Sequence, residues 1–493
     1  MKIKQVLSAA VAGCMLTAIL SGCGTNEEKS ITLKYVMPGP GIQENSKEVW
    51  SVFNDELHER LPGVSVDFEV IPLSEYKQKI MLMMAAREKI DIVNNYSLDF
   101  ATEIANGSFA EMNDLLDKYG KELKEALPEW IWDYETVNGK IYGVPTYQMM
   151  GQTRCICFIK EYADQYLDTD ALRAAIDSAP TFSQNVYDIL GKYCEDLKAN
   201  GIDFETTDTL NPKGYDTVTN QYSVVMGDDK CQVVNRYAND AAKIKYENAA
   251  QWYKKGYIRD DVLSAEDISS LKGKKDGFAF WDEIYSPYAE EELFKKYGNE
   301  ITAVPYDLEP PIGGTALAGG TSIAASSKYP EQAMQIINLI QSDKELYNLL
   351  VYGREGIEYE KIGEDRIETK YDASQASEND SYGLYKWIVG NTERAYSNQS
   401  EPDTYKEWAF NEINASSNRS RIIGFLPDTS SFADRITQTD AIKTQYSNVL
   451  WNGVKGDDWE AYYNEFVEKL NIAGDDVIKS ELQKQIDEFL KDK

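Results

Sequence analysis

Aromatic side chains beside polar ones are the residues of this sequence best suited to chemistry at a binding site. The chain has 33 Tyr and 9 Trp against 15 Phe, and Tyr and Trp combine an apolar ring with a polar tip. Such rings can stack on the apolar C–H face of a sugar while carboxylates, amides or guanidinium groups bind its hydroxyls. For any single ring a place in the core is the alternative, so we favour those near strand and helix ends. The candidate ligand-binding residues are Trp281, Glu283, Tyr96, Asn95, Tyr147, Arg354, Glu355, Trp387 and Trp408.

The sequence lacks the patterns that mark common catalytic sites. His58 is its only histidine, which disfavours histidine-based triads and histidine-rich metal sites. GxSxG, HExxH, a complete SxxK set and the glycine-rich phosphate loops are also absent from it. We therefore predict no catalytic residues, no metal and no cofactor. A carboxylate pair suffices for glycoside hydrolysis, however, and 82 Asp and Glu residues leave that alternative open.

The first elements that must position these residues alternate between strand and helix periods. The pattern predicts strand, helix, strand, helix and strand at 31–36, 45–61, 64–70, 73–87 and 90–93. This order is typical of an open α/β sheet, in which ligands bind beyond the carboxyl ends of the strands. Asn95 and Tyr96 follow the third strand and therefore lie where a ligand is expected.

Later elements are predicted from turn signals and apolar runs. Asn138-Gly139 predicts a hairpin, and 277–281 reads as an aromatic strand that Trp281 ends. The remaining predicted strands and helices cover 154–159, 237–257, 301–304, 321–325, a helix opening at Pro330, and a packed C-terminal helix.

Four cysteines follow Cys23, too few for a disulfide framework in a chain of this length. We expect Cys155, Cys157, Cys194 and Cys231 to be buried small hydrophobes. Cys155 and Cys157 are expected on opposite faces of their strand and not to pair with each other.

Residues 1–22 are predicted to be a lipoprotein signal peptide. Lys2 and Lys4 precede an apolar stretch at 6–20, and Leu20-Ser21-Gly22-Cys23 resembles the bacterial lipobox. Cys23 would then be diacylated and 23–30 would form a tether, which anchors the protein on the extracellular side of the cell membrane. A secretory peptide with a coincidental cysteine is the alternative.

The net charge of −31 argues against nucleic acid as a partner.

The order of these features resembles an extracellular solute-binding lipoprotein of a bacterial ABC importer, of the carbohydrate type that includes the maltose-binding protein. The resemblance rests on the lipobox, the βαβαβ opening, GKIYGVP at 139–145, and the later strands at 277–281 and 321–325. A closer resemblance is to the subgroup with an extra C-terminal region. MPGPG at 37–41, YGREGIEY at 352–359 and LNIAG at 470–474 carry it.

The resemblance implies a two-lobed α/β fold of the type II periplasmic-binding-protein kind. Each lobe would be a mixed sheet flanked by helices, with hinge segments between the lobes and a helical C-terminal extension. The N-terminal lobe would take 31–144 plus 318–348, and the C-terminal lobe 145–317 plus 349–493. Tyr147 would then lie at the first crossing between lobes and Arg354 near the third, where it contacts ligand or pairs with Glu355 or another acid.

The resemblance also implies a non-enzymatic function. The protein would be a monomer that captures a small molecule, a sugar or oligosaccharide, between its lobes and delivers it to the transmembrane subunits of the importer. Few Lys and Arg residues lie in the candidate loops, which argues against phosphorylated ligands. A surface glycoside hydrolase, or a ligand sensor for a membrane kinase, remains the alternative.

Overall fold

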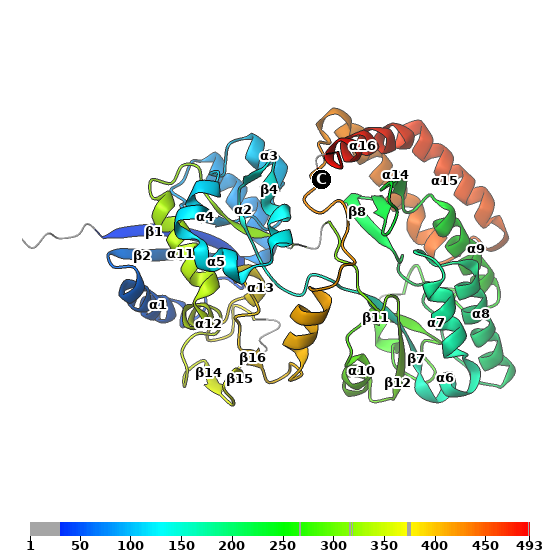
Figure 1. The fold of residues 1–493 in the computed structure, drawn as a ribbon. Helices are drawn as coiled ribbons and strands as arrows, with labels where there is room; N and C mark the ends of the chain where they lie inside the picture. The colour runs from blue at the N-terminus through cyan, green and yellow to red at the C-terminus, as the bar shows by residue number, and fades with distance from the viewer. Residues whose placement is uncertain (1–29, 266–267, 315–316, 318, 372–375, 492) are drawn as a thin grey trace, which may run out of the picture.

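The chain folds into two lobes joined by extended segments (Figure 1). The computed structural model describes residues 30–265, 268–314, 317, 319–371, 376–491 and 493. The predicted signal peptide, Cys23 and all of the tether but Ser30 lie outside these residues. Within them, no helix is long and apolar enough to cross a bilayer.

The first lobe is built on a five-stranded sheet in the order β2-β1-β3-β13-β6. β1 (Ile31–Gly39) pairs in parallel with β2 (Val64–Pro72) and β3 (Ile92–Asn94), whereas β13 (Gly320–Ile323) runs antiparallel to β3 and β6 (Val144–Pro145). α1 (Ser46–Arg60) and α2 (Leu73–Ala85) connect the first three strands, so the predicted βαβαβ opening is confirmed.

Helices and short strands complete this lobe. Asn138 and Gly139 both have positive φ angles, as the tight turn of the predicted hairpin requires. The elements are α3 (Phe100–Ala105), α4 (Asn113–Tyr119), α5 (Lys121–Ala126), the 3-10 helix η1 (Glu129–Glu135), the hairpin β4 (Thr136–Val137) and β5 (Lys140–Ile141), α11 (Pro330–Ser342) and α12 (Lys344–Tyr352).

The segment 349–413 also belongs to the first lobe, which corrects the predicted lobe boundaries. It contains β14 (Tyr359–Lys361), β15 (Arg366–Thr369), β16 (Ser397–Asn398), α13 (Lys386–Val389) and the π-helix η3 (Glu407–Ile413). One core cluster runs from Leu33 through Val351, Leu384 and Phe410, and the Leu384 N–H donates to the Val351 carbonyl at 2.9 Å. The apolar face of α12 therefore continues into this segment, and the third crossing comes after residue 413.

The second lobe has β7 (Arg154–Ile159) at the centre of an antiparallel sheet between β11 (Trp281–Ile284) and β12 (Ile301–Pro305). A second sheet contains β8 (Tyr215–Thr219), β9 (Tyr222–Val225) and β10 (Val233–Asn235). The helices here are α6 (Lys160–Tyr166), α7 (Thr169–Asp177), α8 (Gln184–Ala199), α9 (Asp240–Lys254), α10 (Ala289–Tyr297) and the short η2 (Ser269–Leu271).

The C-terminal helices curve around the outer side of this lobe (Figure 1). They are α14 (Ala433–Trp451), α15 (Trp459–Ala473) and α16 (Asp475–Phe489), with short 3-10 turns η4 (Ser430–Phe432) and η5 (Gly456–Asp458). Ile478, Leu482 and Ile486 are fully buried in one cluster with Val224 of β9. The predicted packed C-terminal helix is confirmed.

The expectation that the β7 cysteines lie on opposite faces of the strand is wrong, whereas the expectation that they do not pair is confirmed. The sulfur atoms of Cys155 and Cys157 lie 3.6 Å apart in the core, because residues two apart in a strand share a face. All four described cysteines are free and buried, as predicted.

Candidate ligand-binding cleft

Three segments cross between the lobes and are bound side by side. We define them as the crossing segments 146–153, 310–314 and 414–420. The Asn414 side chain joins the first and third, because it donates to the Gln148 carbonyl at 2.7 Å and accepts from the Met150 N–H at 2.8 Å. Ile312 joins the second and third through backbone hydrogen bonds to residues 418 and 420 of 2.9 and 2.8 Å. These hydrogen bonds hold the three crossing segments together between the lobes.

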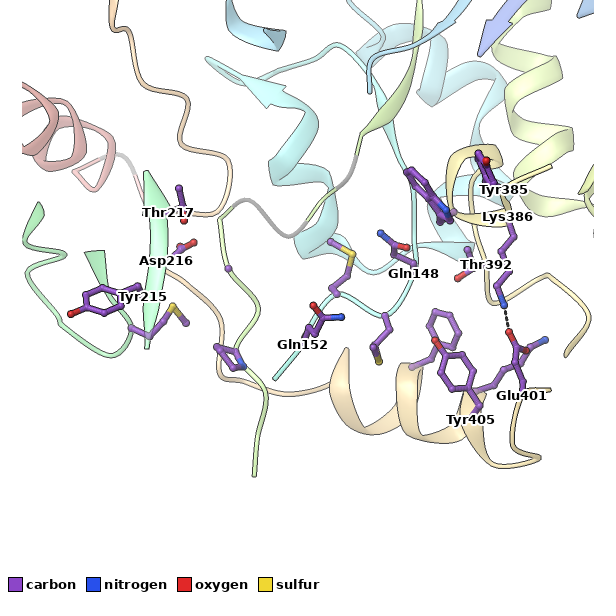
Figure 2. A pocket seen from close by; sticks show the side chains of 18 residues that line it. Gln148, Gln152, Tyr215, Asp216, Thr217, Tyr385, Lys386, Thr392, Glu401 and Tyr405 are labelled. Carbon is purple, nitrogen blue, oxygen red and sulfur yellow. Dashed lines mark hydrogen bonds and ion pairs between the residues drawn. The ribbon is translucent and has the colours of Figure 1, made fainter. Parts of the chain in front are cut away.

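A cavity of about 640 Å³ opens beside these crossing segments. Figure 2 shows side chains of both lobes around it. The cavity is within the usual size of a ligand pocket. The first lobe contributes Tyr385, Lys386, Trp387, Thr392, Glu401, Tyr405, Lys406 and Phe410, the second Tyr215, Asp216, Thr217 and Met226, and the crossing segments Gln148, Met149, Met150, Gln152, Pro311 and Gly313.

An aromatic wall on the first lobe is held by the short helix α13. Ile388 and Val389 are buried and anchor this helix, which leaves Trp387 half-buried at the cavity. The rings of Tyr385 and Trp387 stack at 5.9 Å and 16°, and Tyr96 meets Trp387 edge-on at 5.5 Å. A rigid aromatic surface of this kind suits the apolar face of a ligand.

Two lysines on the same side are held by oxygen atoms of the protein. Lys386 forms an ion pair with Glu401 (Figure 2), and both side chains are mostly buried. Lys406 donates to the carbonyls of Glu393, at 3.1 Å, and Ala395. Burial lowers the pKa of Lys406.

The opposite wall presents the carboxylate of Asp216 on β8. Both of its oxygens accept from the Gly314 N–H, at 2.9 and 2.8 Å, which fixes the second crossing segment to this lobe. Burial raises the pKa of Asp216. Tyr134 from the first lobe donates to the Gly313 carbonyl at 2.5 Å, so this segment is held from both sides.

Uncharged polar groups complete the lining. Gln148 is half-buried and Gln152 is exposed, and neither side-chain amide has a hydrogen-bond partner among the residues that the structure describes. Each amide offers both donors and an acceptor. Together with Thr392 and Thr217, these groups can bind the hydroxyls of a neutral ligand.

Several of the predicted site residues lie at or next to the cavity. Trp387 lines it, and Tyr96 packs on Trp387. Tyr147 lies just behind, 6% exposed, against Phe410. Trp408 is buried behind Tyr405 at 6.1 Å.

Asn95 is a structural residue of the sheet beside the cavity. It is buried and donates to Glu135 at 2.8 Å, while its side-chain oxygen accepts from the Gly320 N–H. Burial raises the pKa of Glu135 to about 8, so this carboxyl group stays neutral at pH 7.

The prediction that Trp281 lies on the cleft wall is wrong. The aromatic strand was expected to end at this residue, but β11 begins there and pairs Trp281 with Cys157 of the central strand. The indole is 0% exposed and lies edge-on to Tyr297 at 5.8 Å in a core cluster. Glu283, also predicted at the wall, is only 16% exposed and lies 3.6 Å from both Lys272 and Lys296.

The structure also places Arg354 and Glu355 away from the crossing segments. Arg354 pairs with the fully buried Glu358 at 2.7 Å, and Glu355 pairs with Lys361 at 3.1 Å. They line a separate surface pocket beside α1. Of the two roles considered for Arg354, the structure shows the ion pair, with Glu358 as the acid.

Sequence reasoning missed Tyr385, Lys386, Glu401, Tyr405 and Asp216. The first two adjoin Trp387 in the run YGLYKW at 382–387, so the local density of aromatic residues could have pointed to them. Glu401 lies in irregular chain and Tyr405 at the start of the short helical stretch that continues into η3, so neither has a long period that marks which side chains face inward.

The chain thus has two α/β lobes, three crossing segments and a cavity with walls from both lobes. The chain is 25% identical over 496 residues to a carbohydrate ABC transporter substrate-binding protein of Streptococcus pneumoniae serotype 4, covering 99% of this chain and 96% of that protein. Residues 421–491 match a family described as a domain of unknown function, DUF3502. That match covers α14 to α16, the C-terminal region of the second lobe.

Solved structures show the same fold. The N-glycan transport solute binding protein NgtS from Streptococcus pneumoniae is 24% identical, with a TM-score of 0.73 over 94% of this chain and 99% of that one. Its complex with Man1GlcNAc has a TM-score of 0.61 over 93% and 99%.

Proposed function

We propose that this chain is the solute-binding component of an ABC importer and captures a sugar or oligosaccharide between its lobes. The observation that carries the proposal is the cavity between the lobes, with the stacked Tyr385 and Trp387 on one side. At the crossing segments it has the amides of Gln148 and Gln152, which have no hydrogen-bond partner among the described residues. Rings stack on sugar faces and amides bind hydroxyls. The relative named as a carbohydrate ABC transporter substrate-binding protein supports the same ligand class.

Ligand capture would bring the two walls together. The same neighbour, NgtS, has a lower TM-score in its Man1GlcNAc complex, 0.61 against 0.73. Such a difference between two structures of one protein is what a change in lobe arrangement produces. The present arrangement is more similar to the first NgtS structure than to its Man1GlcNAc complex.

Glycoside hydrolysis is disfavoured by the state of the carboxylates. The described carboxylates that line the cavity are Asp216 and Glu401. Asp216 is bonded to the Gly314 N–H and Glu401 is paired with Lys386. A glycosidase needs one carboxyl free to protonate the leaving group and another to attack or activate water.

A saccharide panel tests the proposal. The protein is melted with and without neutral oligosaccharides, and a ligand at 100 times its dissociation constant should add about 2.7 kcal/mol to stability. The same mixtures are analysed for products. Stabilisation without hydrolysis supports the proposal, whereas turnover would refute it in favour of the hydrolase.

This chain would work at the cell surface, and the lipid on Cys23 would anchor it to the membrane. The support is the lipobox-like Leu20-Ser21-Gly22-Cys23 after a short apolar stretch. Delivery would then be to the transmembrane subunits, with the protein acting as a monomer. Cys23→Ala should release the protein from the membrane fraction, and a variant that stays bound after a salt wash would contradict the anchor.

A further inference from the structure

Both lysines that line the cavity have their charge satisfied by the protein. The Lys386 ammonium group is paired with Glu401 and lies 5.9 Å from the ring centre of Tyr405. The side chains of Lys386 and Glu401 are only 25% and 15% exposed, so bulk water screens this pair weakly. Lys406 uses its ammonium group on two backbone carbonyls. An incoming anion would meet the negative charge of Glu401 at Lys386 and would compete with two backbone carbonyls at Lys406.

The charges on the cavity wall balance. The described lining residues include two cations, Lys386 and Lys406, and two carboxylates, Glu401 and Asp216. Asp216 stands on the opposite wall and would approach a ligand that the first lobe holds. The whole chain has a net charge of −31, which disfavours the approach of anions over long range.

A further cation, Arg419, does not line the cavity, and its Nε is buried without a hydrogen-bond partner among the described residues. Arg419 of the third crossing segment stacks on Trp130, 4.6 Å from the ring centre, and donates to the Asn414 carbonyl at 3.3 Å.

From this arrangement we infer that the cavity, in its proposed function, selects neutral saccharides and rejects acidic ones, and that the Lys386–Glu401 pair determines this selectivity. A uronate or sulfate group would lose its water without gaining a free cation, which is costly for a buried charge. Neutral hydroxyls avoid this cost, because Gln148, Gln152 and Thr392 can bind them. The pair thus discriminates against the wrong ligand class as well as shaping the wall.

Isothermal titration with two matched sets of probes tests the inference. The neutral set contains manno-, malto- and fructo-oligosaccharides, and the acidic set contains alginate and galacturonate oligomers of the same lengths. The wild-type protein should bind at least one neutral probe and bind every acidic probe about a hundredfold more weakly or not at all.

Glu401→Gln tests the role of the pair. This variant keeps the shape of residue 401 but leaves the Lys386 ammonium group without its carboxylate, so acidic probes should gain about tenfold in affinity. The double variant Glu401→Gln with Lys386→Met is the matched control. It removes both charges and should lose that gain, while thermal melts establish that both variants are folded.

The outcomes separate the inference from the proposed function. Acidic binding as tight as neutral binding in the wild type would overturn the inference and leave saccharide capture intact. Equal gains in affinity for acidic probes in the single and double variants would overturn the role of the Lys386–Glu401 pair. Absence of binding to every probe would overturn the proposed function together with the inference.

Discussion

The two indoles of Trp387 and Trp281 provide a direct test of where the binding site lies. Trp387 is half-buried at the cavity and stacks on Tyr385 at 5.9 Å. Trp281 is 0% exposed in the core of the second lobe. Replacing each by alanine removes the same group from two different environments, so the two variants should fail in different ways.

The expected magnitudes follow from those environments. An aromatic contact in a binding hot spot is worth about 1–3 kcal/mol, so Trp387→Ala should weaken saccharide binding roughly ten- to hundredfold. Truncation of a buried Trp costs about 3–5 kcal/mol of folding stability. At about 2–4 °C per kcal/mol, Trp281→Ala should lower the melting temperature by roughly 6–20 °C.

The assay combines a melt of each ligand-free variant with titration of saccharide well below its melting temperature. Trp281→Phe is the matched control, because the Trp281 indole nitrogen is buried without a hydrogen-bond partner among the described residues. Phenylalanine removes that unpaired donor and keeps much of the ring, so this variant should melt much closer to wild type than Trp281→Ala.

The opposite pattern would refute the reasoning. If Trp387→Ala melts far below wild type and binds normally, its ring is a core residue and the aromatic wall is not the ligand surface. If Trp281→Ala binds poorly while its melting temperature is unchanged, the cleft assignment for the second lobe is wrong. Ligand should also change tryptophan emission in wild type, and most of that change should vanish in Trp387→Ala.

Three further variants test the supporting structure. Burial raises the pKa of Glu135 from 4.5 to about 8, so the folded state keeps a proton that the unfolded chain loses and stability should fall as pH rises through this window. Glu135→Gln should remove that slope, and its melting temperature relative to wild type should be highest at the alkaline end; a parallel pH profile would contradict the assignment. Asn414→Ala removes two hydrogen bonds between crossing segments and should cost about 1–3 kcal/mol in denaturant unfolding; unchanged stability would contradict their role. Arg354→Met leaves the buried Glu358 carboxylate without its cation and should cost about 3–5 kcal/mol at unchanged saccharide affinity, whereas lost affinity at unchanged stability would restore Arg354 to the binding site.

The opening of the fold was predictable because its signals are local. The alternation of 31–36 and the helical spacing of 45–61 each fix a face that must be buried, and the structure has β1 and α1 there. The helical spacing of apolar residues also predicted the C-terminal helix, whose Ile478, Leu482 and Ile486 are all 0% exposed. In these segments the burial pattern can be read within one element.

The lobe boundary could not be read in this way. Whether 349–413 joins the first or the second lobe depends on which surface receives Leu384 and Ile388, and these side chains pack into a core that begins at Leu33. That choice is made by contacts between residues hundreds of positions apart in the chain. The short helix α13 and the π-helix η3 have too few turns for the spacing of their apolar residues to show which lobe they pack against.

The candidate site, like the fold, could be predicted only where the signal lies within a short stretch of sequence. Trp387 was found because an indole in a polar aromatic run is visible in sequence, but Trp281 in GFAFW gives the same signal and is core. What separates them is the neighbour: Trp281 starts a strand that pairs with the buried Cys157, whereas Trp387 follows Lys386, whose charge must remain near a carboxylate. That carboxylate, Glu401, lies on irregular chain where only the folded structure brings it to the lysine. The aromatic part of the cleft could therefore be proposed from residue types, while its charge balance, on which ligand selectivity rests, exists only as a pairing in space.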